Sequence, residues 1–104
     1  MYDYYFTEMA SRALLGDLRN ITDMCIQDQR PRAQYMHYYR KNSKKILDLL
    51  KNWCSEYPKD EKYMLLSQIS EYYRTHPKCT FDTQKQLSQD IKQIIQNYER
   101  GNQN

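Results

Sequence analysis

The sequence has little of what usually divides a chain into short elements, with two glycines and three prolines among 104 residues. Because glycine and proline mark turns, this scarcity argues against many short strands and favours long helices. No apolar run approaches the ~18 residues that indicate a membrane-spanning helix, so we expect no membrane segment. The first residues also lack a basic stretch ahead of an apolar block, and we therefore expect no secretory signal and a cytoplasmic protein.

Soft metal ligands are few, with three cysteines and two histidines. In a reducing compartment the thiols are expected to stay free. In an antiparallel bundle Cys25, His76 and Cys79 would meet at one end, and Cys54 would lie at the other. Their spacing matches no zinc-finger pattern, and a structural zinc ion prefers four ligands. We therefore predict no metal and no cofactor, and Cys25, His76 and Cys79 are the candidates if a metal binds.

Catalytic motifs are also missing from the sequence. There is no glycine-rich phosphate loop, no nucleophile elbow and no Glu-x-x-His pair. His76 and Cys79 are the only thiol and imidazole close in sequence, and they flank a proline-containing turn, where a catalytic dyad is not expected. We therefore predict that the protein is not an enzyme.

Apolar residues recur at intervals of three and four in four segments, which is the spacing of one face of an α-helix. The predicted core faces are Phe6, Ala10, Ala13, Leu14, Leu18, Ile21, Met24 and Cys25; Met36, Tyr39, Ser43, Ile46, Leu50, Trp53 and Tyr57; Leu65, Leu66, Ile69, Tyr72 and Tyr73; and Leu87, Ile91, Ile94, Ile95 and Tyr98. Tyr35 also lies close to the second of these faces.

Turn signals separate the four segments. Pro31 is placed as an early residue of the second helix, Pro58 ends that helix, and Pro77 follows the third. Gly101 is a suitable residue to follow the fourth helix, whose start can be capped by Thr80 or Asp82. The sequence therefore predicts an all-α single domain of residues 1–100 with a frayed tail at 101–104. We expect an antiparallel bundle of four amphipathic helices, two long and two shorter, with an irregular helical array as the alternative.

One segment resembles a known DNA-binding motif. Residues 83–91 read TQKQLSQDI and resemble the scanning helix of an Xre-type helix-turn-helix, and residues 94–102, IIQNYERGN, resemble the end of its recognition helix. The glycine-containing turn between the two helices is missing. The apolar face of this segment also runs through it without a break, and we therefore predict a single helix.

Charge is distributed unevenly along the chain. Residues 28–52 contain seven basic and two acidic residues. On a helical projection Lys41 and Lys44 point away from the core face of the second helix, and Tyr38 and Arg40 flank that face. A solvated surface is one explanation for these cations. The other is weak nucleic-acid binding, with phosphates held by the cations and bases stacked on Tyr38.

Several large side chains lie off the predicted core faces, namely Tyr4, Tyr5, Tyr38, Tyr63 and Met64. Tyrosine, methionine and arginine are enriched in protein interfaces. We therefore predict a small helical interaction protein that binds another protein, such as an inhibitor, adaptor or regulatory module encoded by a phage or mobile element. Weak nucleic-acid binding and self-association are the alternatives. The candidate binding residues are Tyr38, Arg40, Lys41, Lys44, Lys45, Tyr63 and Met64.

Overall fold

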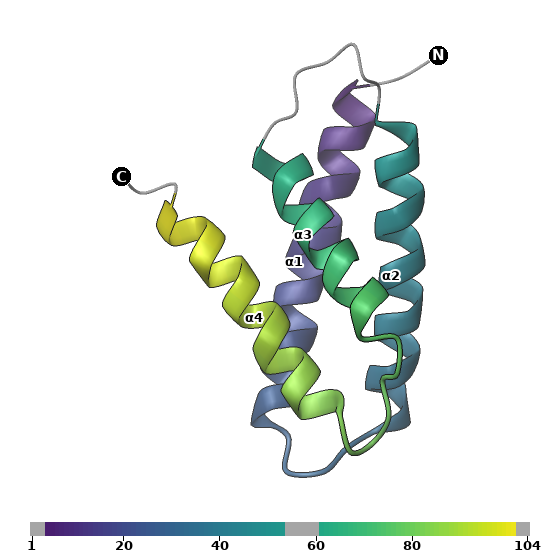
Figure 1. Ribbon diagram of the computed structural model, residues 1–104, viewed down its shortest axis with the longest axis vertical. Helices are drawn as coiled ribbons and strands as arrows, with labels where there is room; N and C mark the ends of the chain where they lie inside the picture. The colour runs from purple at the N-terminus through teal and green to yellow at the C-terminus, as the bar shows by residue number, and fades with distance from the viewer. Residues whose placement is uncertain (1–3, 54–60, 102–104) are drawn as a thin grey trace.

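The computed structural model describes residues 4–53 and 61–101, apart from the side chain of Tyr4. These residues form α1 (Tyr4–Gln27), α2 (Ala33–Asn52), α3 (Glu61–Thr75) and α4 (Gln84–Gly101), with no strand among them. The helices run alternately down and up the molecule, and the C-terminal end of α4 leans away from α3 (Figure 1). The prediction of an all-α fold with two longer and two shorter helices is confirmed.

The helices pack in a closed cycle, in which α1 contacts α2, α2 contacts α3, α3 contacts α4 and α4 returns to α1. The pairing of α1 with α4 is the most extensive of the four. Leu18, Ile46, Leu66, Ile69 and Ile91 are fully buried where the helices meet. Each such side chain contributes about 1.5–3 kcal/mol through its removal from water. None of the described helices is both long and apolar enough to cross a membrane.

Half of the buried residues of α1 are small and polar, and this corrects the predicted apolar face. Thr7, Ser11 and Thr22 are almost completely buried. Their burial is tolerated because the Ser11 hydroxyl donates to the Thr7 carbonyl at 2.7 Å, and the Thr22 hydroxyl donates to the Arg19 carbonyl at 2.9 Å. Leu15, Leu18 and Cys25 complete this side; Ala10, Leu14 and Ile21 are half-buried, and Phe6, Ala13 and Met24 are exposed.

The other three helices bury faces close to the predicted ones. Tyr35 is buried as expected, and Asn42 and Leu49 join it on the core side of α2. Tyr57 lies outside the described residues. Of the remaining predicted core residues, Tyr39, Ile46, Trp53, Leu65, Leu66, Ile69, Tyr73, Leu87, Ile91 and Ile95 are buried, and Met36, Ser43, Leu50, Tyr72, Ile94 and Tyr98 are half-buried.

The link between α1 and α2 differs from the prediction at Pro31, which precedes the second helix instead of beginning it. Asp28 accepts hydrogen bonds from the Arg30 backbone N–H at 3.1 Å and from the Arg32 guanidinium at 2.5 Å. These bonds hold the link in a turn, and Arg32, with φ −135° and ψ 143°, becomes the extended residue before α2. The helix therefore starts at Ala33.

The ends of α4 also differ from the prediction. Thr83, and neither Thr80 nor Asp82, immediately precedes the helix, and its carbonyl accepts the first helical bond from the Leu87 N–H at 2.9 Å. The Thr83 hydroxyl accepts from the Thr80 N–H at 2.9 Å, which organises the turn before the helix. Gly101 is the last residue of α4 instead of following it. The continuity of α4 confirms that this segment is one helix. The predicted end of the second helix at Pro58 is wrong, because α2 already ends at Asn52 and Trp53 is extended, with φ −74° and ψ 116°. Pro58 itself and the tail at 102–104 lie outside the described residues.

Tyrosine hydroxyls join the helices in pairs. The Tyr73 hydroxyl of α3 donates to the Asn42 side-chain carbonyl of α2 at 2.8 Å, and Tyr39 of α2 hydrogen-bonds Ser88 of α4 at 2.5 Å. Burial raises the pKa of both phenols well above the ordinary value, so the hydroxyls stay protonated and can donate. Tyr39 and Tyr73 therefore supply the core with large rings whose polar ends are hydrogen-bonded.

Candidate interaction surfaces

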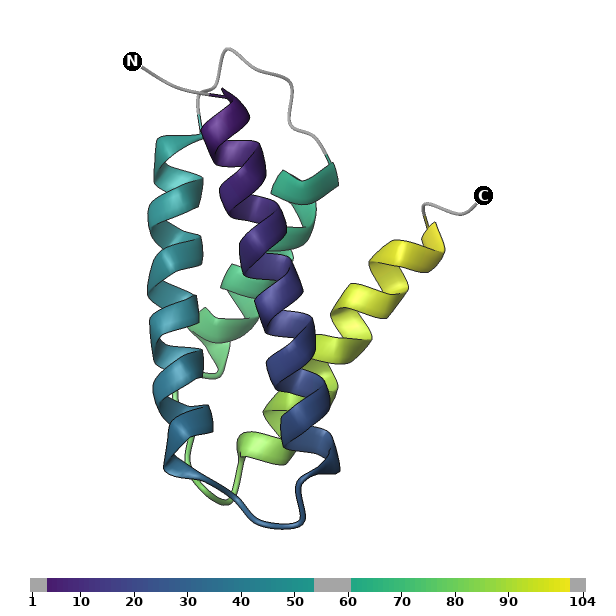
Figure 2. The same ribbon diagram turned by 180° about the vertical axis from the view of Figure 1, so that it is seen from behind.

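The most exposed large apolar side chains of the described residues lie on one side of α1. We call this side the outer face of α1, and it is formed by Tyr5, Phe6, Met9, Ala13 and Gly16. Tyr5 is 80% exposed, and Phe6 and Met9 are each 70% exposed. At 100° per residue this face points directly away from the buried side of the helix. Seen from behind the molecule, α1 stands in front, and no described helix covers this side (Figure 2). An apolar face of this size on a surface helix marks an interaction site more often than isolated exposed residues do.

Charged residues border the outer face of α1. Arg12 is exposed and pairs with Glu8 at 3.1 Å, and Glu8 also accepts a bond from Lys62 of α3 at 2.8 Å. Asp17 is exposed on the opposite border. Ala13 and Gly16 leave the C-terminal half of the face low, and a Cβ atom added at Gly16 would meet no atom within 4 Å. The face thus combines an apolar centre with a polar rim, as protein interfaces do.

Sequence periodicity assigned part of this face to the core. Helix α1 carries apolar residues on two opposite sides. The spacing of apolar residues therefore predicted Phe6 and Ala13 to be in the core, although both are exposed. The signal that separates the two sides is the row of small hydroxyl residues at Thr7, Ser11 and Thr22. Such residues can satisfy themselves on their own helix and pack closely against a neighbour.

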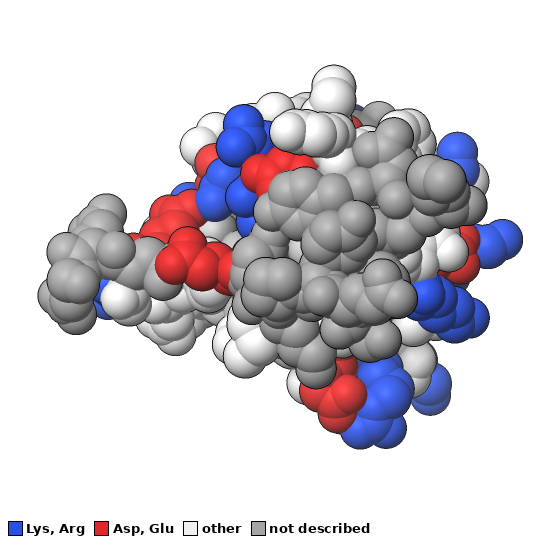
Figure 3. All heavy atoms as spheres, turned by 90° about the horizontal axis from the view of Figure 1, so that it is seen from above, with Lys and Arg blue, Asp and Glu red and all other residues white. Residues whose placement is uncertain are grey.

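The basic face of α2, formed by Arg40, Lys41, Lys44 and Lys45, is where the sequence placed it. All four side chains are exposed. None of them takes part in an ion pair with another described residue. Figure 3 shows Lys and Arg side chains projecting from the side of the molecule on which α2 stands in Figure 1. These cations are therefore available to an anionic partner.

Tyr38 and Tyr63 are less available than the sequence suggested. Tyr38 is half-buried with its ring edge against Tyr39 at 5.8 Å, and its hydroxyl is enclosed. Burial, and secondarily the charge of Asp17, raises the pKa of Tyr38 to about 12. Tyr63 is also half-buried and packs against the core, with its ring edge-on to Trp53 at 5.3 Å. Neither ring is therefore a free stacking platform.

The remaining predicted anchors differ in accessibility. Met64 is 50% exposed and Tyr5 is 80% exposed, as expected for side chains off the core faces. The side chain of Tyr4 lies outside the described residues. Since Tyr5 and Met64 lie on different helices, only Tyr5 belongs to the larger apolar surface on α1.

Cys25, Cys79 and His76 are not arranged as a metal centre. Cys25 and Cys79 are buried free thiols, and the Cys25 Sγ contacts the Gln84 carbonyl at 3.7 Å. His76 is exposed and turned toward Tyr72, so the predicted candidate set is not assembled. Among the residues that the structure describes, no three His, Cys, Asp or Glu side chains are placed to hold a metal ion. Burial raises the pKa of both thiols and makes them poor nucleophiles. Cys54 lies outside the described residues.

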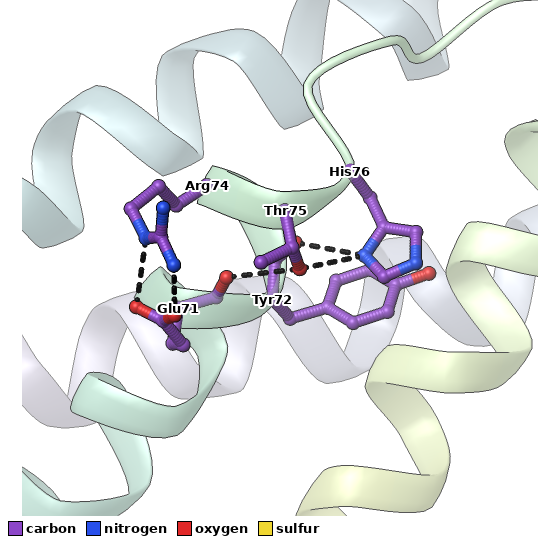
Figure 4. A network of polar contacts seen from close by, with 5 residues as sticks. All are labelled: Glu71, Tyr72, Arg74, Thr75 and His76. Carbon is purple, nitrogen blue, oxygen red and sulfur yellow. Dashed lines mark hydrogen bonds and ion pairs between the residues drawn. The ribbon is translucent and has the colours of Figure 1, made fainter.

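A cleft of about 430 Å³ opens between the end of α3 and the start of α4. On its wall the His76 imidazole stacks on the Tyr72 ring at 4.2 Å, and its Nδ1 lies 3.1 Å from the Tyr72 carbonyl (Figure 4). The Tyr72 hydroxyl donates to Asp90 at 2.6 Å, and Gln86 donates to the other carboxylate oxygen at 2.8 Å. Asp90 therefore joins α3 to α4. Both of its carboxylate oxygens already accept hydrogen bonds within the protein, so the carboxylate is not placed to act as a general base in the cleft.

Comparison of the chain with protein-family models, with curated protein sequences and with solved structures found no match. Inferences about function therefore depend on the outer face of α1, the basic face of α2 and the cleft between α3 and α4. Of these three surfaces, the outer face of α1 has the largest exposed apolar side chains.

Proposed function

We propose that the protein is a small non-enzymatic interaction module that binds another protein chain through the outer face of α1. The observation that carries the proposal is the exposure of Tyr5, Phe6 and Met9 on one side of one helix. Fully burying each of these side chains would provide about 1.5–3 kcal/mol before the costs of association. An adaptor or inhibitor of another protein fits such a surface.

The chemistry of the rest of the molecule supports a binding role. Both oxygens of Asp90 accept bonds from within the protein, and the thiols of Cys25 and Cys79 are buried. Aromatic residues and methionine on a helix face suit the recognition of an apolar surface, because they offer large contact areas and few charges to desolvate.

Photo-crosslinking of the full chain tests this proposal. A photoreactive side chain placed at Ala13, in the middle of the outer face of α1, is expected to give a discrete crosslinked product with another protein chain in extracts of the native host. The same side chain placed at Gln93, which is exposed on α4, is the matched control. Met9→Glu should remove the Ala13 product without changing the helical circular dichroism signal. Equal products from both positions, or a product that survives Met9→Glu, would contradict the proposal.

The basic face of α2 supports a second candidate function, the weak binding of nucleic acid. Arg40, Lys41, Lys44 and Lys45 are exposed without an ion-pair partner among the described residues. Because each phosphate contact releases condensed counterions, four contacts predict a log–log salt slope of roughly −3 to −4 on duplex DNA. Reversal of all four charges should abolish binding and its salt dependence. The absence of any binding at low salt would exclude this function.

A further inference from the structure

We infer that the outer face of α1 binds a second copy of the same chain, with the two α1 helices packed antiparallel. This inference rests on the proposed function and names the partner of the same surface. It depends on the order in which large and small side chains occur along the face. Phe6 and Met9 lie in its N-terminal half, and Ala13 and Gly16 occupy the next two turns.

The large and small positions match when a second α1 runs in the opposite direction. Phe6 and Gly16 share residue 11 as their midpoint, and so do Met9 and Ala13. One antiparallel register centred at residue 11 therefore brings each large side chain to the height of a small one on the other helix. A twofold axis repeats both contacts, which gives the self-complementary interface of a symmetric dimer. A parallel pair would instead set large side chains against large ones.

The space at the small positions is consistent with this packing. The Cβ position at Gly16 has no neighbouring atom within 4 Å, and Ala13 is exposed. Helices approach most closely where such small residues face large ones, since the ridge of one helix then enters the groove of the other. The borders of the face carry Arg12 and Asp17, both exposed, so each copy brings opposite charges to the rim.

The area of the face is sufficient for a small interface between two copies. An aromatic side chain offers about 150–250 Å², and with Met9 of similar size Tyr5, Phe6 and Met9 together expose on the order of 500 Å². Two copies would bury about 1,000 Å², which is the lower limit for a specific interface. Because interfaces at the low end of this range are typically weak, we expect a reversible dimer with micromolar or weaker affinity.

Sedimentation equilibrium of the full chain tests the inference. Between about 1 and 500 µM the mass should rise from that of the monomer toward that of the dimer, as the expected affinity requires. Met9→Glu should weaken the dimer about tenfold or more, because the carboxylate would lose water against an apolar partner. Gln93→Glu, which adds the same charge on an exposed site of α4, should leave the dimer unchanged. Circular dichroism of each variant checks that the fold is retained.

A mixing experiment tests the antiparallel register. Ala13→Lys alone should also weaken the dimer, because the cation would meet Met9 of the second copy. A mixture of Met9→Glu chains with Ala13→Lys chains should dimerise again, since one contact becomes an ion pair and the other keeps its original residues. Failure of the mixture to dimerise would overturn the register.

Two results would overturn the inference as a whole. One is a wild-type chain that stays monomeric at the highest concentration, and the other is a dimer that Met9→Glu leaves intact. If the chain is monomeric but the photoreactive side chain at Ala13 still gives a product with a different protein, the proposed function stands and only the partner is wrong. If neither a dimer nor a crosslinked product forms, both proposals fail.

Discussion

Gln84 holds the link between α1 and α2 against the start of α4. Its side chain is 1% exposed, and its amide is paired with the backbone of Arg32. The carbonyl oxygen accepts from the Arg32 N–H at 3.0 Å, and the amide nitrogen donates to the Arg32 carbonyl at 2.8 Å. Gln84→Met removes both bonds and nearly preserves the volume of the side chain, so it isolates the contribution of the hydrogen bonds.

The expected loss follows from the two bonds. Each net hydrogen bond contributes about 0.5–1.5 kcal/mol, so Gln84→Met should lower the free energy of unfolding by about 1–3 kcal/mol. For a chain of this length the melting temperature should fall by roughly 5–15 °C. Urea denaturation followed by circular dichroism measures the free energy, and Gln89→Met, at an exposed position on the same helix, is the control.

Amide hydrogen exchange provides an independent check at the link. The Arg32 N–H should exchange faster in Gln84→Met, because its acceptor is lost, whereas amides in the middle of α2 should follow only the global change in stability. A change in unfolding free energy below about 0.5 kcal/mol, which is typical of surface substitutions, would refute the view that this contact fixes the link.

Three other substitutions test the fold. Gly16→Ala should raise the free energy of unfolding by about 1 kcal/mol, because alanine favours a helix more than glycine does and the added methyl meets no atom within 4 Å. Urea denaturation at micromolar protein concentration measures this change, and a loss of stability would show that the space at Gly16 is not free. Tyr73→Phe should cost about 1–3 kcal/mol, because it leaves the buried Asn42 amide without its donor, and a near-neutral result in urea denaturation would contradict that pairing. Asp28→Asn should flatten the pH dependence of stability. Hydrogen bonds from Arg32, Arg30 and Tyr35 hold the pKa of Asp28 well below its ordinary value, so its stabilising effect is present at neutral pH and declines as acid protonates it. Melting curves from pH 7 down to pH 2 measure this, and parallel curves for the two proteins would disprove the assignment.

The number of helices and most of their approximate ends were predictable, because apolar spacing and proline positions are local properties of the sequence. The end of α2 was not, because the apolar spacing continues beyond Asn52, where the helix stops. The basic face of α2 followed from the same periodicity. The orientation of α1 did not, because the helix is apolar on two sides and buries small hydroxyl residues that bond to their own backbone. A search for apolar rows alone therefore cannot identify which side of α1 is buried.

The role of Gln84 was also beyond prediction from the sequence. Glutamine is usually a surface residue, and its burial depends on backbone groups 52 positions earlier in the chain. Tyr63 shows the same limitation, because its place off the apolar row of α3 suggested exposure. It is partly covered by Trp53, which comes from the end of a different helix. Contacts between distant segments decide burial at such positions, and local patterns do not contain them.

The close pairing of α1 with α4 has a consequence for synthesis of the protein. Of the four helices α1 leaves the ribosome first and α4 last, although these two pack together most extensively. At 5–20 residues per second, roughly 4–15 s separate the completion of α1 from that of α4. During this interval the side of α1 that packs against α4 lacks its cover, so the nascent chain should be a substrate for chaperones that shield apolar helices. Premature termination before α4 would leave α1 without its most extensive contact, so it should be more damaging than the loss of an equal length of surface loop.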